Sequence, residues 1–175
     1  NEGFLKEVGK GLNLKYGIKS YKEKIKKIHD YGIQVLGSFI LGTDYDDKNT
    51  VKQLKNFIFD ASVDIAHVFP LYPLPGTRLY DRFKKEKRLL YNKYWLEDVI
   101  PFVTYKPKKM TPNELSQEIF DLWSDTLKYP NSIKRFFISL KETKNLVGST
   151  LSYYENFRMN QCRKISKKIH YNYFA

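Results

Sequence analysis

The chain has 175 residues, of which 42% are hydrophobic, and it contains 14 Tyr and 12 Phe. This composition excludes a chain that is disordered throughout, and it suffices for one ordinary core or for part of a larger domain with an appendage. Lys and Arg outnumber Asp and Glu by 31 to 19, which gives a net charge of +12. Because Lys, Asn, Ile and Tyr are abundant together, we interpret the charge as a solvated surface rather than a nucleic-acid footprint.

No apolar run reaches the length of a membrane span, and residues 1–3 begin no targeting signal, so we expect a cytoplasmic protein without a transmembrane segment. The single cysteine, Cys162, excludes an internal disulfide framework and a metal cluster built on several thiolates of this chain. We expect it to be an inert thiol. The chain opens with Asn1 rather than Met, and we expect an upstream part of the same polypeptide to be its partner.

The first half of the chain alternates helices and strands. Apolar residues at helical spacing predict a first helix that Ser20 caps and Gly32 ends, with His29 solvated on its lysine-rich side. The run Ile33–Leu41 is apolar nearly throughout, as in a parallel strand covered on both faces. A second helix from Val51 follows a polar turn.

A second strand is predicted over Asp64–Leu71 and a third helix after Thr77. Each strand runs into a turn, Gly42-Thr43-Asp44 in the first case and Pro73-Leu74-Pro75-Gly76-Thr77 in the second. Parallel strands place their C-terminal ends on one face of the fold, where ligands bind in α/β proteins. Two such strands do not close a core, so the pattern implies further strands, most plausibly upstream.

The C-terminal third has a different character. Thr111, with Pro and Glu in the following turn, predicts a helix start. A break at residues 129–131 precedes a basic helix, whose inward side we expect to be formed by the following residues: Ile133, Phe136, Phe137 and Leu140. A last helix is predicted from about Leu146 to Ile169. We therefore divide the chain into an α/β part, residues 1–110, and a small all-α appendage, residues 111–175.

Three segments carry a family resemblance. These are His29-Asp30-Tyr31-Gly32, then residues 37–42 with the letters GSFILG, and then residues 73–80 with the letters PLPGTRLY. In this order and spacing they resemble the later part of the radical S-adenosylmethionine barrel, and more narrowly the subgroup with an N-terminal cobalamin-binding domain. The resemblance covers nearly the whole chain.

The resemblance implies a C-terminal fragment of a partial (β/α) TIM-like barrel that holds strands five and six. It also implies a [4Fe–4S] cluster and cobalamin, whose ligands would lie upstream of Asn1, so that the fragment alone would be inactive. The activity implied for the whole enzyme is methylation, or a related radical reaction, at an unreactive carbon of a small-molecule or lipid-like substrate.

The resemblance also implies site residues. The family's small-x-Ile-x-Gly pattern maps onto Ser38, Ile40 and Gly42, which would lie beside the adenine of S-adenosylmethionine. The remaining predicted cofactor contacts are Lys10, Phe69, Leu71 and Pro73. Residues of the predicted substrate rim are His67, Pro75, Gly76 and Thr77. No catalytic residue and no metal ligand is predicted within the chain.

Structural roles for the same residues, and other functions, remain open as alternatives. Gly42 serves equally well for a tight approach between strand and helix, and a lone histidine such as His67 is more often a core or rim residue than a catalyst. The basic C-terminal helices suit nucleic-acid or membrane-surface contact, although helix cores with snorkelling lysines explain them better. The alternative function is a basic RNA-binding module or part of a tRNA-modifying enzyme.

Overall fold

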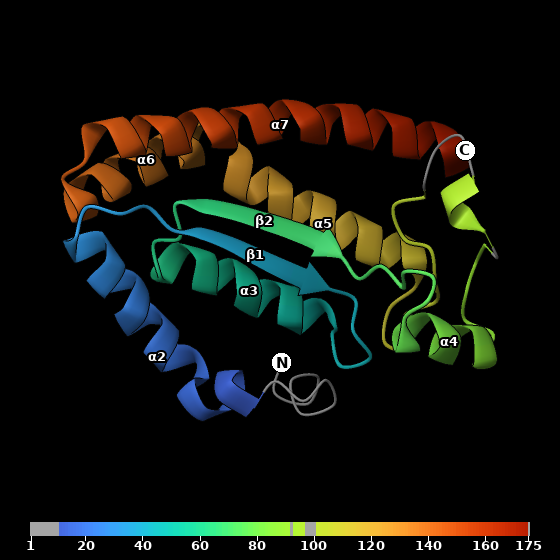
Figure 1. Ribbon diagram of the computed structural model, residues 1–175. Coiled ribbons are helices and arrows are strands. Elements are labelled where there is room, and N and C mark those ends of the chain that lie inside the picture. The colour runs from blue at the N-terminus through green and yellow to red at the C-terminus, as the bar shows by residue number, and fades with distance from the viewer. Residues whose placement is uncertain (1–10, 92, 97–100, 175) are drawn as a thin grey trace.

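The computed structural model describes residues 11–91, 93–96 and 101–174, and side chains between residues 20 and 165 of those ranges. Its elements follow the predicted order of helix, strand, helix, strand and helix, and then further helices (Figure 1). They are α2 (Gly11–Asp30), β1 (Leu36–Leu41), α3 (Lys48–Asp60), β2 (Ile65–Pro70), α4 (Arg78–Lys85), the 3-10 helix η1 (Tyr94–Leu96), α5 (Pro112–Leu127), α6 (Tyr129–Thr143) and α7 (Leu146–Phe174). The α/β class is confirmed, and the described residues form no closed barrel.

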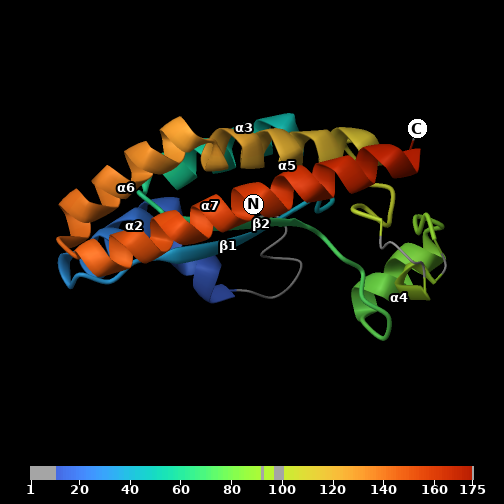
Figure 2. The ribbon, with the colours of Figure 1, turned by 90° about the horizontal axis from the view of Figure 1, so that it is seen from above.

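Strands β1 and β2 are parallel, in a register that runs from Leu36 opposite Ile65 to Leu41 opposite Pro70. Helix α3 connects them, as a crossover between parallel strands requires. Helices α3 and α5 lie behind the sheet in the view of Figure 1, and the view from above shows them together on one side of the strands (Figure 2). The strand burial patterns agree, because in each strand the residues on that side are less exposed than their neighbours on the other side.

The core lies between the covered face of the sheet and the helices α3 and α5. Ala66 and Val68 of β2 belong to it together with Ile58 of α3 and Ile119 of α5. The side of α5 that faces the strands consists of these buried residues: Leu115, Ile119, Leu122, Trp123 and Thr126. Helix α5 therefore packs directly on the strands.

Side-chain caps fix where two helices begin. Asp47 accepts a hydrogen bond from the backbone N–H of Thr50, and the Thr50 side chain accepts one from the backbone N–H of Asp47. Thr111 and Glu114 form the same reciprocal pair at the start of α5, as predicted. The cap predicted at Ser20 is wrong, because α2 begins at Gly11 and the residues before Ser20 contain no proline that would end a helix.

The edge of β2 that faces away from β1 is covered by side chains of the C-terminal helices. Trp123 Nε1 of α5 donates to the carbonyl oxygen of Val68 at 3.0 Å. Arg135 of α6 donates to the carbonyls of Val63 and Asp64 at 2.6 and 2.8 Å. Asn156 of α7 also donates to the Asp64 carbonyl, at 2.8 Å. These donors occupy acceptors that a further strand would otherwise use.

The proline at the end of β2 closes the same edge. Leu71 donates its N–H to the carbonyl of Leu41, so its neighbour Pro70 faces the outer edge, where it has no N–H to offer. In contrast, no described strand pairs with β1 on the side opposite β2. The sheet therefore has one completed edge and one open edge.

Helix α6 has its polar and apolar sides reversed relative to the prediction, and α7 likewise turns polar residues inward. Their buried residues are mostly small or polar: Ser132, Arg135, Ser139 and Thr143 on α6, and Ser149, Ser152, Asn156 and Asn160 on α7. Ile133 and Phe137, predicted to face inward, are exposed, and Phe136 and Leu140 are only half-buried. The inward side is polar because its side chains form hydrogen bonds with the outer edge of β2 and with the neighbouring helix. Ser139 of α6 and Ser149 of α7, for example, hydrogen-bond at 3.1 Å.

No helix among the described residues is both long enough and apolar enough to cross a membrane. Even α7, with 29 residues, carries charged side chains from Glu155 onward.

His29 was expected to be solvated, and that expectation is wrong. Its side chain is 1% exposed and lies between two carboxylates, with Nε2 2.8 Å from Asp64 Oδ2 and Nδ1 2.9 Å from Glu142 Oε2. The hydrogen bond to Asp64 and the two negative charges outweigh burial and raise the pKa of His29. A protonated imidazole satisfies both carboxylates at once, so His29 ties α2 to the start of β2 and to α6.

We predict that replacing His29 by Asn lowers the free energy of unfolding by about 3–5 kcal/mol, because Asp64 is then buried without its partner. Since the folded-state pKa of His29 is raised, its contribution is complete below its unfolded pKa and is lost as the pH rises through the folded value. Urea unfolding across neutral pH measures both effects. Lys26→Gln is the matched control on the same helix, because the Lys26–Asp30 ion pair is exposed. A variant His29→Asn with wild-type stability would contradict this assignment.

Candidate functional site

The uncovered face of the two-stranded sheet is the candidate site. Residues that alternate along the strands form it as three opposed pairs: Leu36 with Ile65, Ser38 with His67, and Ile40 with Phe69. Three of its apolar members are strongly exposed, with Leu36 at 51%, Ile40 at 56% and Phe69 at 45%. Exposed apolar side chains in such a row mark a surface that another structure covers.

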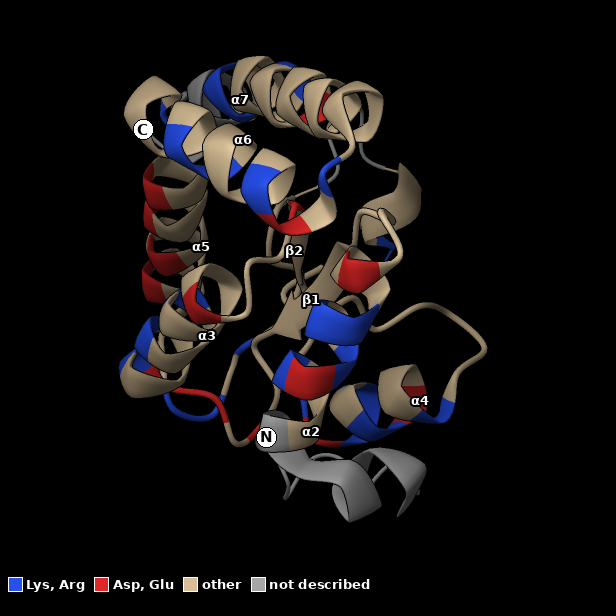
Figure 3. Ribbon diagram, turned by 90° about the vertical axis from the view of Figure 1, so that its left-hand side faces the viewer, with Lys and Arg blue, Asp and Glu red and all other residues tan. Residues whose placement is uncertain are grey.

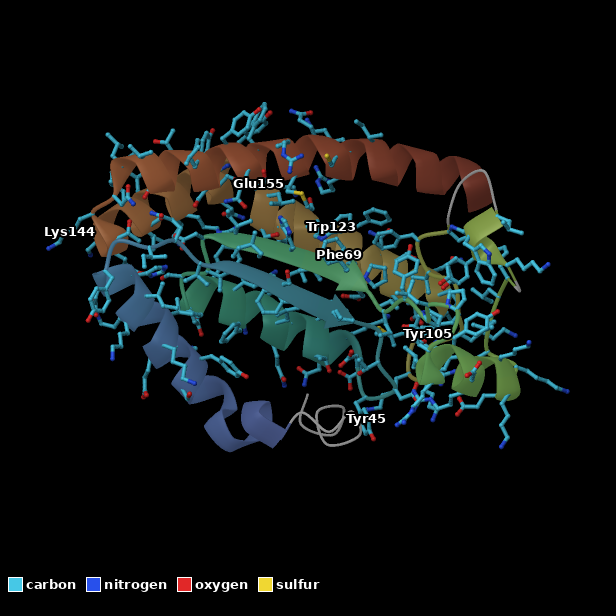
Figure 4. The ribbon with its side chains drawn as sticks, viewed as in Figure 1. Tyr45, Phe69, Tyr105, Trp123, Lys144 and Glu155 are labelled. Atoms are coloured by element: carbon cyan, nitrogen blue, oxygen red, sulfur yellow. The ribbon has the colours of Figure 1, made fainter. Side chains whose placement is uncertain are left out.

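The pair Ile40 and Phe69 lies nearest to the C-terminal ends of the strands. Figure 4 labels Phe69 at the end of β2, on the uncovered side of the sheet. Parallel strands present ligand-binding residues at these ends. The structure thus brings the predicted residues Ser38, Ile40, His67 and Phe69 onto one face, with an aliphatic and an aromatic side chain closest to the strand ends.

Gly42, at the end of β1, serves packing on the other side of the sheet. Its φ is +98°, and a Cβ atom there would overlap the hydroxyl of Tyr105 and the side chain of Leu115. The Tyr105 hydroxyl donates to the Gly42 carbonyl. The tight approach that we kept open for this glycine is therefore present, and its contact with a cofactor remains a prediction.

The predicted turn after β2 is confirmed. Leu71 is buried in the core, and buried Pro73 accepts a hydrogen bond from Tyr94 at 3.1 Å through its carbonyl. Pro75 and Gly76 are exposed, and Thr77 caps α4 by accepting the N–H of Tyr80. The turn fixes where α4 begins, and its role at a substrate rim remains a prediction. Lys10 lies outside the described residues.

His67 has a charged neighbour that the sequence did not reveal. Its Nε2 lies 3.7 Å from Oε1 of Glu155 on α7, and its ring lies edge-to-face with that of Phe69. Arg158 binds both oxygens of Glu155, at 2.7 and 2.9 Å. This bond lowers the pKa of Glu155 against the effect of burial, so the carboxylate is ionised beside the histidine. Figure 4 places Glu155 on the side of α7 that faces β2.

Asp44, an acidic residue just after β1, forms ion pairs with three basic side chains of the same fold. Arg88 Nη2 lies 2.7 Å from it, Lys108 Nζ 3.1 Å and Arg82 Nη2 3.5 Å. Burial raises the pKa of Asp44, but the hydrogen bonds and charges of Arg88 and Lys108 outweigh it, so the pKa lies below its ordinary value. Asp44 therefore holds the β1 end against α4 and the segment before α5.

Among the described residues, no three His, Cys, Asp or Glu side chains gather as metal ligands. Cys162 is a free cysteine and is exposed on α7. The described part of the chain therefore does not supply the ligands of an iron–sulfur cluster, and a cluster held by an upstream segment remains a prediction.

We predict different costs for two glycines that share a positive φ. Gly42→Ala should destabilise the protein by about 2–4 kcal/mol, which combines backbone strain with overlap against Tyr105 and Leu115. Gly76 has φ +81° and no atom within 4 Å of the position that a Cβ would take. Gly76→Ala should therefore lower the free energy of unfolding by only about 1 kcal/mol, which is the backbone strain alone. Urea unfolding of both variants tests this, and equal losses would show that the packing at Gly42 is not tight.

The comparisons with known proteins give partial similarities to methyl-transferring enzymes. Over 70 residues the chain is 36% identical to the hopanoid C-2 methylase of Rhodopseudomonas palustris, a match that covers 40% of the chain and 13% of the methylase. Over 94 residues it is 33% identical to a Methanocaldococcus jannaschii protein provisionally named a methylthiotransferase, covering 52% of the chain and 20% of that protein.

A third relative is an uncharacterized methyltransferase of Pyrococcus horikoshii, 26% identical over 113 residues, which are 65% of the chain and 24% of the relative. No family model and no solved structure matches. The chain thus spans between 13% and 24% of the length of these curated relatives. It is distantly similar, over part of its length, to radical S-adenosylmethionine methylases and methylthiotransferases.

Proposed function

We propose that this chain forms the last two strands of a radical S-adenosylmethionine barrel, together with the C-terminal helices of that enzyme. The observation that carries the proposal is the asymmetry of the sheet. Side chains of α5, α6 and α7 complete the outer edge of β2, whereas the edge of β1 is open. The outer edge of a last strand must have its backbone N–H and C=O groups paired or covered, whereas the strand before it pairs with a neighbouring strand on each side.

The uncovered face supports the same assignment. Leu36, Ile40 and Phe69 are too exposed for the interior of a self-contained fold, and they lie on the side that would line the inside of a barrel. Barrel interiors are filled by such alternating residues from successive strands. Further strands that continue from the β1 edge would curve over this face and enclose it.

Within that barrel, we propose that Ile40 and Phe69 contact the adenine of S-adenosylmethionine. The two side chains are opposed across β1 and β2 at the strand ends, and an aliphatic and an aromatic group suit a flat, weakly polar ring. Ser38 follows one layer deeper and can offer its hydroxyl. When bound, S-adenosylmethionine and the cluster would supply radical chemistry, and cobalamin would carry a methyl group.

The described residues fit S-adenosylmethionine but not the other two groups. They contain a single thiol, so the cluster would be held by another part of the polypeptide, as would cobalamin. On this assignment the chain alone binds part of a cofactor and does no chemistry. For the whole enzyme we propose methylation at an unreactive carbon of a small-molecule or lipid-like substrate, in keeping with the C-2 methylase among its relatives.

The test compares two positions on the same strand and the same face. Ile40→Asn should weaken binding of S-adenosylmethionine to the full-length, cluster-reconstituted protein by roughly tenfold or more, because it introduces a polar group against the adenine. Leu36→Asn is the matched control, since Leu36 has similar exposure and the same facing but lies at the other end of β1. Anaerobic calorimetric titration measures both affinities.

Equal affinities of Ile40→Asn and Leu36→Asn would remove the site assignment. Thermal unfolding of the two full-length variants provides a check on folding, and we expect similar changes in the two, because both side chains lie on the face that the barrel would enclose. A gene product without a cluster-binding segment would contradict the proposed enzyme class as a whole.

A further inference from the structure

The outward surface of α6 and α7 has no partner within the described fold, although it is strongly apolar. Phe137 is 62% exposed and Tyr154 61% exposed, and their neighbours on the two helices are exposed as well. We define the outer apolar face by these residues: Ile133 and Phe137 of α6, and Val147, Leu151 and Tyr154 of α7. A patch of this kind on a folded protein marks an interaction surface.

Helical geometry places the outward residues of each helix on one side of that helix, and the two helices lie side by side. On each helix the outward residues lie on the side opposite the buried serines, asparagines and arginine, at spacings of three or four positions. The two helices pack along each other, since Tyr129 of α6 meets Phe157 of α7 and Phe136 meets Tyr153. Figure 1 shows α7 along the upper margin of the molecule and α6 below it at the left end.

The surface is cationic as well as apolar. The exposed basic residues of α6, α7 and the turns before and between them are Lys128, Lys134, Lys141, Lys144, Arg158 and Lys164. Two acidic side chains lie on the same helices, and both have basic or imidazole partners: Glu142 contacts His29, and Glu155 is bound by Arg158. In Figure 3, Lys and Arg mark α6 and α7, whereas Asp and Glu line the outer side of α5. Figure 4 shows Lys144 projecting from the turn between α6 and α7.

We propose that the outer apolar face of α6 and α7 docks on the surface of an anionic lipid membrane. Helices that lie in a membrane interface insert apolar and aromatic groups among the acyl chains and place lysines at the headgroups. The outer apolar face, with its flanking lysines, matches this arrangement in both chemistry and charge. The helices would lie on the membrane, which agrees with the absence of a membrane-spanning helix in the described residues.

Two other occupants fit the observations less well. RNA would use the aromatic rings and lysines, but the aliphatic residues Ile133, Val147 and Leu151 offer bases nothing to stack on. A second copy of the chain docked through the same face would place like charges opposite each other, because a two-fold interface pairs a patch with itself. A lipid surface uses the aliphatic and the basic residues together.

The inference is independent of the proposed enzyme class, because it depends on helices that lie outside the candidate cofactor site. It therefore has its own test. The intact protein is sedimented with vesicles of phosphatidylcholine and with vesicles of phosphatidylcholine containing phosphatidylglycerol. We expect binding to the anionic vesicles, and binding that is weakened by salt.

Two double variants separate the apolar from the basic contribution. Phe137→Ser with Tyr154→Ser should weaken binding to the anionic vesicles by roughly tenfold or more, since both rings are exposed and their loss leaves the core intact. Lys134→Gln with Lys141→Gln should do the same and also flatten the salt dependence. Two control variants should bind the vesicles as wild type does. The apolar control is Leu74→Ser on the exposed turn, and the basic control is the double variant Lys84→Gln with Lys85→Gln on α4.

Three results would overturn the proposal. One is equal binding of the controls and the two double variants, and another is no binding to either kind of vesicle. The third is a wild-type protein that binds RNA or self-associates instead of binding vesicles, and that loses this binding when Phe137 and Tyr154 are replaced by Ser. Circular dichroism of the variants verifies that each has folded.

Discussion

The structure depends on how the outer edge of β2 is closed. A parallel strand leaves alternate N–H and C=O groups pointing away from its neighbour, and burying them without partners is costly. Here Trp123, Arg135 and Asn156, one from each of the last three helices, donate to the carbonyls of that edge, and Pro70 removes an N–H. Because each helix supplies a donor, the position of the whole C-terminal region follows from the needs of one strand edge.

This constraint explains why α6 and α7 turn polar residues inward. A helix that must offer donors to a strand edge turns polar side chains inward, as Arg135 and Asn156 do, so its apolar residues are left outward. Burial lowers the pKa of Arg135 to about 10, which still leaves it charged at neutral pH, and three backbone carbonyls accept its hydrogen bonds. The closure of the sheet and the outer apolar face are thus two consequences of one arrangement.

Local patterns in the sequence predicted the elements well and the long-range contacts poorly. The strands, the turn at Pro73–Thr77 and the Thr111 cap were predictable because each depends on neighbouring residues. The inward side of α6 was predicted wrongly, since hydrophobicity alone does not reveal a strand edge that requires donors. Buried His29 contacts Glu142, which lies 113 residues away in the sequence, and His67 contacts Glu155 of α7. No local sequence pattern indicates either contact.

The predicted site residues illustrate the same limit. Alternation along two parallel strands was enough to place Ser38, Ile40, His67 and Phe69 on one face, because side chains alternate at a period of two. The packing of Tyr105 and Leu115 against Gly42 was not predictable, since both come from the region after α4. The further strands that we propose for the uncovered face could not be predicted in detail, because the described residues contain only β1 and β2.

The open edge of β1 gives the most direct test, through hydrogen exchange of its amides in the full-length gene product. The amides of Ser38 and Ile40 point away from β2, because the carbonyls of Val35 and Leu41 point toward it. If β1 continues into further barrel strands, these two amides should be protected as strongly as those of His67 and Phe69, which pair with β1. Exchange of Ser38 and Ile40 at the rate of unprotected loop amides would contradict the account.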